Sequence, residues 1–572
     1  MEKIFYGLKK HRLSLAVTFI LYVLSTLCAV ALPTLMTSVV DNGINARDMA
    51  FIYKACLMMG AVTLLDVVFT VLGAFFGNRA ILSFNAGLKE RVFEKIVSMP
   101  PKQLKKFRTG ALLTRSIDDV DRIGDVLGTL FTMLATLPIT LIAGCVLAFR
   151  KSALLAAVLL AFTPVVFLVI FLCGRNTHKH WTIAEEQIDE QNALIRSRLT
   201  GIRIVRAFNR EQTEQEKIEK ATRLMSKSMV RGNMRAELIA PISMFVLNVA
   251  TVLIVFIGAK QITAPDTLLT AGGVLAVIEY VGMITMGILN ISYFLSEIPR
   301  FRTNCKRVAE ILSADDENDG YKEQPLDTDG SVRFENVGFS YVQDRLAIQG
   351  VTAEIKAGET VAFIGGTGAG KSTLVRLLCG LDQPTQGKIF FGNTDISALS
   401  PKSIRKYVSC VKQRDVVFSG ALKYSVGAAG EYADEEIVCA LADGQMGGFL
   451  QEKQEGLDFM IRERGGNLSG GQKQRVTIAR ALLKDAAVYI FDDSFSALDF
   501  LTESRLRAKL NERLRGKTKI IVTQRVATAR SCDKIFVFDQ GRLLAVGRHG
   551  ELLQTCAVYK EIYLSQTGEE IQ

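Results

Sequence analysis

The chain has 572 residues, of which 49% are hydrophobic and 22% are charged. Together with a mean hydropathy of +0.23, this composition excludes a disordered chain, which has fewer apolar residues, and a fibrous repeat, which has far more Pro and Gly. The net charge of +11 suits either a nucleic acid or an anionic membrane face, so the positions of Lys and Arg must decide between them.

Six apolar stretches in the first half are long enough to cross a membrane, which takes about 20 residues of helix. Four carry no charged residue, and the other two carry one acid each, Asp66 and Glu279. The first stretch is too long for the apolar part of a cleaved signal peptide, so we expect it to be retained. The predicted spans are 13–40, 55–78, 126–149, 152–174, 238–259 and 267–296.

Basic residues are unevenly distributed between these spans. Segments 1–12, 79–125 and 175–237 hold 4, 10 and 13 Lys and Arg, whereas the other connections hold few, among them Arg47 and Lys260. Because basic loops stay on the cytoplasmic side, this predicts a multi-pass protein of the cytoplasmic membrane with both termini in the cytoplasm. The asymmetry also explains most of the net charge, so no nucleic-acid partner is expected.

The two long inner loops, 79–125 and 175–237, are rich in Ala, Leu, Glu, Lys and Arg and poor in Gly and Pro. We therefore expect each to continue as helix beyond the membrane. About 25 residues of such helix would protrude by close to ~40 Å. The extensions could reach a cytosolic domain, or they could form a charged, solvated hairpin without a partner.

The fold expected is an all-α six-span transmembrane domain at 1–313, a polar linker at 314–330 and an α/β domain at 331–572, where short β-branched runs alternate with helical ones. The strand 360–364 leads directly into a GxxxxGK[ST] phosphate loop. Its N–H groups would hold phosphates, Lys371 would reach the β- and γ-phosphate oxygens, and Ser372 would bind Mg²⁺. The loop consists of Gly365, Gly366, Thr367, Gly368, Ala369, Gly370, Lys371, Ser372 and Thr373.

A second buried strand, 487–491, ends in Asp492 and Asp493. Acidic residues at such a strand end predict one carboxylate on Mg²⁺, assigned to Asp492, and another near the γ-phosphate. Between the two strands, Leu468 precedes a Ser-Gly-Gly-Gln sequence that opens a helix. Its hydroxyl and N–H groups would form a γ-phosphate site, or would only cap the helix. The four residues are Ser469, Gly470, Gly471 and Gln472.

The order of these motifs resembles the nucleotide-binding domain of an ATP-binding cassette (ABC) transporter, and the six preceding spans make the chain similar to an exporter half-transporter. The resemblance implies a RecA-like core plus a helical subdomain, with Tyr341 stacking on adenine and Gln413 sensing Mg²⁺ and the membrane domain. It also implies that 496–499 crosses to a partner and that 109–121 and 201–211 couple the inner helices to the cassette. ATP would be clamped between one chain's phosphate loop and the other chain's LSGGQ.

Two positions depart from the family pattern. Asp493 stands where a catalytic glutamate is usual, and Gln524 stands where a switch histidine is usual. A carboxylate withdrawn by about 1 Å orients the attacking water poorly, which can cost ~100-fold, and a neutral amide cannot share charge as an imidazole can. We therefore expect this site to bind ATP tightly and hydrolyse it slowly, although both residues could also be tolerated in an active site.

The intact LSGGQ would then complete the site of a different half-transporter, as in heterodimeric multidrug exporters. The expected activity is ATP-driven export of hydrophobic or amphipathic compounds, including lipid-like ones. Asp66 and Glu279, as acids within spans, favour a cationic small-molecule substrate, or they serve interhelical hydrogen bonds or a hydrated vestibule. The alternative function is an ATP-gated regulatory or channel-like subunit with little coupled pumping. The ten cysteines contain no CxxC pair and are expected as core residues in a reducing compartment.

Overall fold

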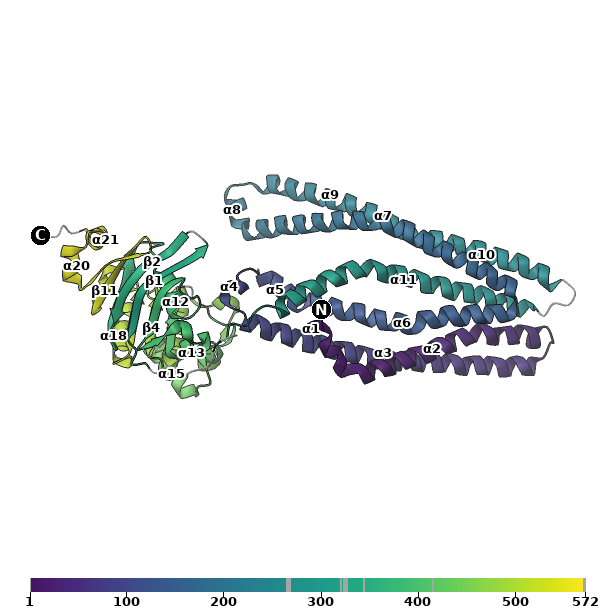
Figure 1. Ribbon diagram of the computed structural model, residues 1–572, viewed down its shortest axis with the longest axis horizontal. Helices are drawn as coiled ribbons and strands as arrows, with labels where there is room; N and C mark the ends of the chain where they lie inside the picture. Colours follow the sequence, from purple (N-terminus) through teal and green to yellow (C-terminus); the bar gives the residue numbers. More distant parts are fainter. Residues whose placement is uncertain are drawn as a thin grey trace. The chain divides into compact units, whose positions relative to one another are not determined.

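The chain folds into two compact units in the computed structural model (Figure 1). The first comprises Met1–Val97 and Phe107–Ala314, and the second comprises Ser98–Lys106 and Asp315–Gln572. The structure describes residues 2–107, 109–263, 269–318, 321, 328–342, 345–413 and 416–568. Much of the predicted linker, 319–320 and 322–327, lies outside the described residues, so its bounds and those of the two domains stay predictions.

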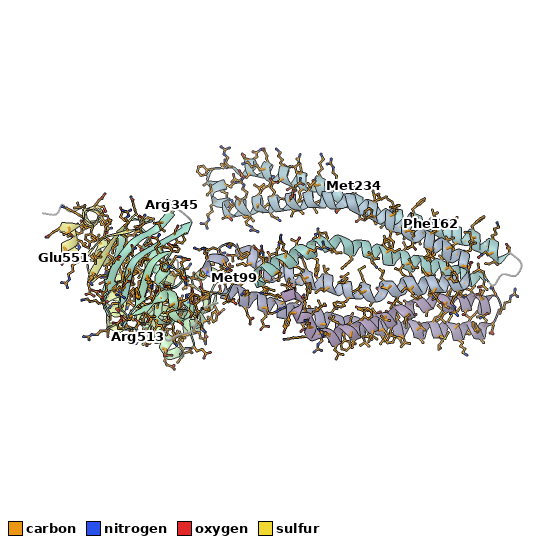
Figure 2. The ribbon with its side chains drawn as sticks, viewed as in Figure 1. Met99, Phe162, Met234, Arg345, Arg513 and Glu551 are labelled. Carbon is orange, nitrogen blue, oxygen red and sulfur yellow. The ribbon has the colours of Figure 1, made fainter. Side chains whose placement is uncertain are left out.

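Long helices build the first unit, and each predicted span falls on one of them. They are α2 (Arg12–Ser38), α3 (Met49–Ser98), α6 (Asp118–Lys151), α7 (Ala153–Thr200), α10 (Ile239–Ile262) and α11 (Ala271–Leu312). Within the described residues, five helical segments are long and apolar enough to cross a membrane, and the shorter apolar stretch Ala153–Val169 begins α7. Phe162, in that stretch (Figure 2), packs against the core of the bundle.

The helices continue past the apolar stretches, which confirms the prediction for the inner loops. With 50 residues, α3 is about 75 Å long, and α9 (Glu211–Glu237) packs along α7. The short helices α5 (Thr109–Ser116) and α8 (Ile202–Ala207) interrupt the two inner segments. They lie within the segments 109–121 and 201–211 that were expected to couple the two domains, a role that stays a prediction.

Small residues let the helices of the first unit approach closely. A Cβ at Gly144 of α6 would lie 3.1 Å from Ile284 of α11, and one at Gly258 of α10 would lie 2.6 Å from Val274 of α11. Because lipid tails are as apolar as these side chains, close packing rather than water exclusion must hold the helices together. The packed helices surround Tyr280, whose hydroxyl bonds with that of Thr34 at 2.7 Å.

The second unit contains the expected parallel sheet and an antiparallel sheet that the sequence did not predict. In the described part, the larger sheet has the order β12 (Arg542–Gly547), β11 (Lys534–Asp539), β3 (Thr360–Gly365), β10 (Thr518–Val522), β9 (Val488–Asp492) and β6 (Val408–Val411), with only β12 antiparallel. The smaller has the order β2 (Arg345–Ile355), β1 (Val332–Val342), β4 (Gln386–Phe391) and β5 (Thr394–Asp395).

A single apolar cluster joins both sheets to α12 (Lys371–Leu378). Its aromatic centre is Phe363 of β3, whose ring lies 5.5 Å from that of Phe536 and 5.3 Å from that of Phe538. A separate cluster fills a helical subdomain that includes α15 (Asp434–Asp443) and α17 (Gly470–Leu483). The first of these two clusters, which contains residues of β3, β9 and β10, fixes the carboxyl ends of these strands side by side. Ligands bind at this edge in sheets of this kind.

Candidate functional site

The phosphate-loop sequence forms a tight turn between β3 and α12. Gly368 and Gly370 have φ of +82° and +94°, and a Cβ at Gly370 would lie 2.6 Å from Ile348 and 3.0 Å from a backbone oxygen. Only glycine fits such a position without strain. A Cβ at Gly368 would meet no atom within 4 Å, so the outer side of the turn is open space in which a ligand can approach the backbone.

Lys371, the first residue of α12, is directed back over this turn. Its side chain is 7% exposed, and Nζ donates to the carbonyl oxygens of Gly365 and Gly366 at 2.8 Å each. Burial lowers the pKa of the Lys371 ammonium, an effect that Asp492 and Asp493 oppose. A cation held in this way favours an anionic ligand, because a buried charge is stable only when it is paired.

Asp492 and Asp493 follow β9, as the sequence predicts. The Ser372 hydroxyl donates to Asp492 Oδ1 at 3.1 Å, and burial raises the pKa of the Asp492 carboxyl. Asp493 has a left-handed φ of +50°, and its N–H donates to Val522 O at 3.0 Å. The two carboxylates therefore come from one strand end but have different surroundings, with Asp492 buried and Asp493 half-buried.

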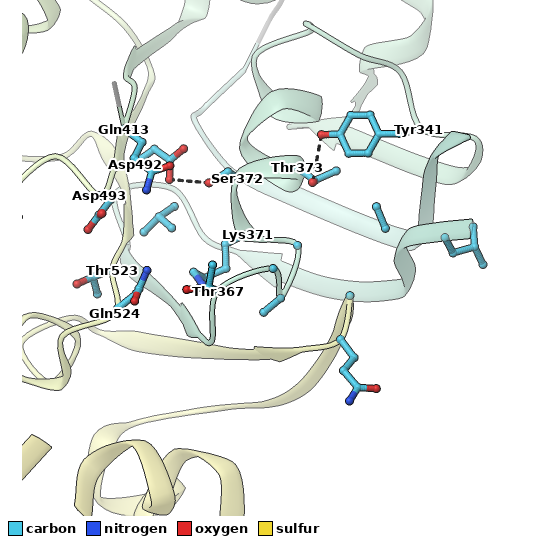
Figure 3. Close-up of a pocket in the computed structure, with 18 of the residues that line it drawn as sticks. Tyr341, Thr367, Lys371, Ser372, Thr373, Gln413, Asp492, Asp493, Thr523 and Gln524 are labelled. Atoms are coloured by element: carbon cyan, nitrogen blue, oxygen red, sulfur yellow. Dashed lines mark hydrogen bonds between the residues drawn. The ribbon is translucent and has the colours of Figure 1, made fainter. Parts of the chain in front are cut away.

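These side chains line one cavity of about 800 Å³ (Figure 3), within the range of small-ligand sites. The structure brings together all three residues predicted to be catalytic, Asp493, Gln524 and Gln413, and the phosphate loop from Thr367 to Thr373. Tyr341 lies at the same cavity and its hydroxyl donates to Thr373 Oγ1 at 3.2 Å. Gly365 and Gly366 contribute through the bonds from Lys371.

Some of the lining was not predicted. Arg345 opens β2, and Gln540 and Gly541 form the turn between β11 and β12, where Gly541 O accepts from Gln349 N at 2.8 Å. A Gln-Gly turn between two apolar runs is a hairpin signal, but nothing in it places the turn beside a phosphate loop. Within the same unit, Lys105 Nζ lies 5.4 Å from the centre of the Tyr341 ring.

The loop that carries Gln524 is held from the C-terminal helix α21 (Ala557–Thr567). The Gln566 side chain donates through Nε2 to Gln524 O at 2.6 Å and accepts from Val526 N–H at 2.8 Å. Both bonds are to the backbone, so they fix the loop while they leave the Gln524 side chain free to reach the cavity. No sequence motif pointed to Gln566.

Ser469 and Gln472 cap α17, and the described lining of the cavity contains neither. The Ser469 hydroxyl accepts from Gln472 N–H at 3.2 Å, and Gln472 Oε1 accepts from Ser469 N–H at 2.8 Å. The motif therefore forms a reciprocal capping box, which is the second of the two roles expected for it, a helix cap rather than a γ-phosphate site. A Cβ at Gly471 would lie 3.1 Å from Ala497 O, so the glycines of this motif pack against the segment that follows Asp493.

A polar network continues from that segment to the loop of Gln524. Gln474 of α17 accepts from Ala497 N–H at 3.1 Å, and Arg525 donates to Ser496 O at 3.1 Å. Arg525 also donates to Glu503 at 2.9 Å, and Glu503 is 5% exposed. Hydrogen bonds through residues 496–497 therefore connect α17, which begins after Ser469, with the loop of Gln524 in the same chain.

Comparisons with known proteins agree with this geometry. The profile of the ABC transporter transmembrane region matches residues 15–289, and the ABC transporter profile matches 348–496. An uncharacterized ABC transporter ATP-binding protein of Mycobacterium tuberculosis (strain ATCC 25618 / H37Rv) is 31% identical over 569 residues, which cover 98% of this chain and 97% of that protein. The chain belongs to the ABC transporter family. Its second unit therefore carries the ATP-binding function that the family domain implies.

Two further similar proteins are a lipid flippase and an exporter of known structure. An ATP-dependent lipid A-core flippase of Thiobacillus denitrificans (strain ATCC 25259 / T1) is 26% identical to this ABC transporter over 568 residues, covering 98% of this chain and 97% of the flippase. The structure of a bacterial Atm1-family ABC exporter with ATP bound superposes with a TM-score of 0.83 at 24% identity, covering 99% of both chains. This structural likeness shows that the two share a fold, which confirms the expected arrangement of a helical membrane domain followed by a cassette.

Proposed function

We propose that this ABC transporter exports hydrophobic or amphipathic compounds across the cytoplasmic membrane by hydrolysing ATP. Support comes from the combination of apolar helices and a cassette on one chain, and from similarity to a lipid A-core flippase. The positive inner segments support an orientation with both termini in the cytoplasm. The lipid bilayer is then the immediate partner of the first unit.

The residues at the cavity fit ATP and Mg²⁺. The buried Lys371 ammonium and the open backbone of the phosphate loop suit a triphosphate. Ser372 and Asp492 offer oxygen ligands of the kind Mg²⁺ prefers, and Gln413 lines the same cavity. When bound, Mg²⁺ would neutralise charge on the phosphate oxygens. Tyr341, held by Thr373, would offer its ring to adenine.

The observation that carries the finer proposal is that Asp493 and Gln524 line this cavity together with Lys371. The Asp493 carboxylate would have to orient the attacking water from one bond further away than a glutamate does. Gln524 can donate a hydrogen bond to a phosphate oxygen but carries no charge. We infer that this chain's own site binds ATP well and hydrolyses it slowly.

The intact signature sequence supports a partner. Ser469 and Gln472 lie outside the described lining of the chain's own cavity. Between them, α17 begins with Gly470 and Gly471, and the N–H groups at a helix N-terminus favour an anion. We propose that they complete the ATP site of a second half-transporter. Because that site must turn over for the pump to work, we expect the partner to be a different chain with glutamate and histidine at the two positions.

The test is to measure ATP turnover by the purified chain, alone and with a co-expressed second half-transporter. Slow turnover alone and fast turnover in the mixed complex are expected. Fast turnover by the chain alone would contradict the slow site. ATP-dependent uptake of a fluorescent phospholipid into inside-out vesicles tests export itself, and nucleotide binding without uptake would instead favour the regulatory or channel-like function.

A further inference from the structure

Two cysteines of the second unit meet where α12 packs on the larger sheet. Cys379 is the residue at which α12 ends, and its side chain is 6% exposed. Cys410 lies in β6 and is partly exposed. Cys379 is a member of the apolar cluster that joins the two sheets to α12, and Cys410 packs against that cluster. The two segments are therefore held together by a packed core.

The pleat of β6 turns the Cys410 side chain toward α12. The neighbouring Ser409 hydroxyl donates to Ala481 O of α17 at 2.9 Å, so Ser409 faces the α17 side of the sheet. Successive side chains of a strand point to opposite faces. Cys410 therefore points to the other face, where Val408 and Cys379 pack in the apolar cluster. On that face the Cys410 thiol donates a hydrogen bond to Cys379 Sγ.

Two basic side chains lie close to Cys379. Arg405 of α13 (Pro401–Tyr407) donates through Nε to Cys379 O at 3.3 Å, and Lys484 Nζ donates to Arg405 O. The hydrogen bond from Cys410 lowers the pKa of the Cys379 thiol, and the charge of Arg405 acts in the same direction, although burial opposes both. Oxidants attack the thiolate form of cysteine, so Cys379 is the more reactive member of the pair.

We propose that Cys379 and Cys410 are a redox modification site, at which hydrogen peroxide forms a reversible disulfide that weakens nucleotide binding. The Cys379 thiolate attacks one peroxide oxygen, the O–O bond breaks, and the hydroxide released takes up the proton that Cys379 lost. Cys410 Sγ then attacks the sulfenic sulfur, and the hydroxyl group leaves as a second water with the Cys410 proton. Two thiols lose two electrons, and one peroxide becomes two waters. Disulfides inside cells are usually transient and redox-sensing.

The disulfide acts on the nucleotide cavity through both cysteines. Bonded sulfur atoms lie about 2.05 Å apart, closer than in a hydrogen bond, so the bond draws the end of α12 toward β6. The eight residues of α12 begin with Lys371 and Ser372 of the phosphate loop. On the other side, Gln413 lines the cavity only three residues after Cys410. We therefore expect the oxidised protein to bind Mg-ATP more weakly than the reduced one.

Cys532 provides the matched control. It is also a buried cysteine of the second unit, but its Sγ donates to Thr528 O at 3.7 Å. Burial raises the pKa of the Cys532 thiol to about 11. This thiol is therefore protonated at neutral pH and should resist peroxide.

The experiment treats the full chain in lipid nanodiscs with hydrogen peroxide and then digests it with trypsin without reduction. The Lys and Arg positions place the two cysteines in separate peptides, 377–388 and 407–412, so mass spectrometry detects the disulfide as one linked peptide. Titration with a fluorescent ATP analogue measures affinity before oxidation, after it, and after dithiothreitol. We expect the linked peptide, a severalfold loss of affinity, and recovery of affinity with dithiothreitol.

The variants decide whether the loss belongs to this pair. Cys379→Ala and Cys410→Ser should each abolish the linked peptide and the loss of affinity, whereas Cys532→Ala should abolish neither. Affinity before oxidation shows that each variant is folded. The site is refuted if no linked peptide forms while the exposed Cys439 is oxidised in the same sample. The regulatory role is refuted if the linked peptide forms without a change in affinity, or if the loss persists in both cysteine variants.

Discussion

Lengthening the acid at position 493 is the most direct test of the slow site. Asp493→Glu adds one carbon–carbon bond, about 1.5 Å, and so restores the side-chain length of the glutamate that is usual at this position. A misplacement of about 1 Å can cost ~100-fold in rate, which corresponds to ~2.7 kcal/mol of activation free energy. We therefore expect the substitution to raise the rate of ATP hydrolysis, by up to this factor.

The backbone conformation at position 493 is expected to make Asp493→Glu less stable, so thermal stability must be measured separately from turnover. Asp493 has a φ of +50°, a region that Asp and Asn occupy more readily than Glu does. Some loss of thermal stability is therefore expected in Asp493→Glu. Asp493→Asn is the matched control, because it keeps the size and the backbone preference but removes the charge.

The assay is phosphate release at saturating Mg-ATP by the chain in nanodiscs, with ATP affinity measured in parallel. We expect turnover to rise in Asp493→Glu, to change little in Asp493→Asn, and ATP affinity to be unchanged in both. The reasoning is refuted if Asp493→Asn abolishes the turnover of the natural chain while Asp493→Glu brings no gain, because the aspartate would then already be a competent base.

Four further expectations follow from the contacts described above. Gln566→Ala removes two hydrogen bonds worth ~1 kcal/mol each, so kcat should fall severalfold with KM unchanged, whereas a purely structural role would lower the melting temperature alone. Tyr341→Ala should weaken ATP binding about tenfold, by analogy with base stacking on aromatic rings, whereas Tyr341→Phe should leave it unchanged. Titration with a fluorescent nucleotide measures both affinities. Phe363→Ala should cost ~3–5 kcal/mol in denaturant unfolding, and a loss under 1 kcal/mol would mean that the core collapses around the site. Burial lowers the pKa of His549 below its usual 6.5, so the folded state binds fewer protons, and the melting temperature should fall as pH drops through and below 6.5, less so in His549→Gln.

Local signals predicted the parts of the fold that depend on a continuous stretch of sequence. The spans followed from the length of apolar runs, and α12 began at Lys371, where the phosphate loop predicts a helix. The strand before Asp492 was displaced by a single residue, since β9 runs Val488–Asp492. In each case the physical cause, whether hydrophobic length or a glycine turn, lies within about 20 residues.

The remainder depends on contacts between distant segments. The antiparallel sheet pairs β1 with β4 across more than 40 residues of chain, and the pattern of those runs alone fits a buried parallel strand as well. Gln566 reaches Gln524 through a helix that has no motif, and Gln540 reaches the cavity through a hairpin turn. Tyr341 was expected only because of the resemblance to a family, since a lone tyrosine in a strand predicts nothing about adenine.

The two hydrogen bonds from Gln566 of α21 to the loop of Gln524 limit how this transporter can be tagged or shortened. Gln566 lies in the final turn of α21, one residue before the helix ends at Thr567. A tag inserted within α21, or a deletion that removes Gln566, would disturb the amide that steadies the loop beside the cavity. A preparation altered in this way would hydrolyse ATP slowly because of the change to α21, and the low rate could be wrongly assigned to the natural chain.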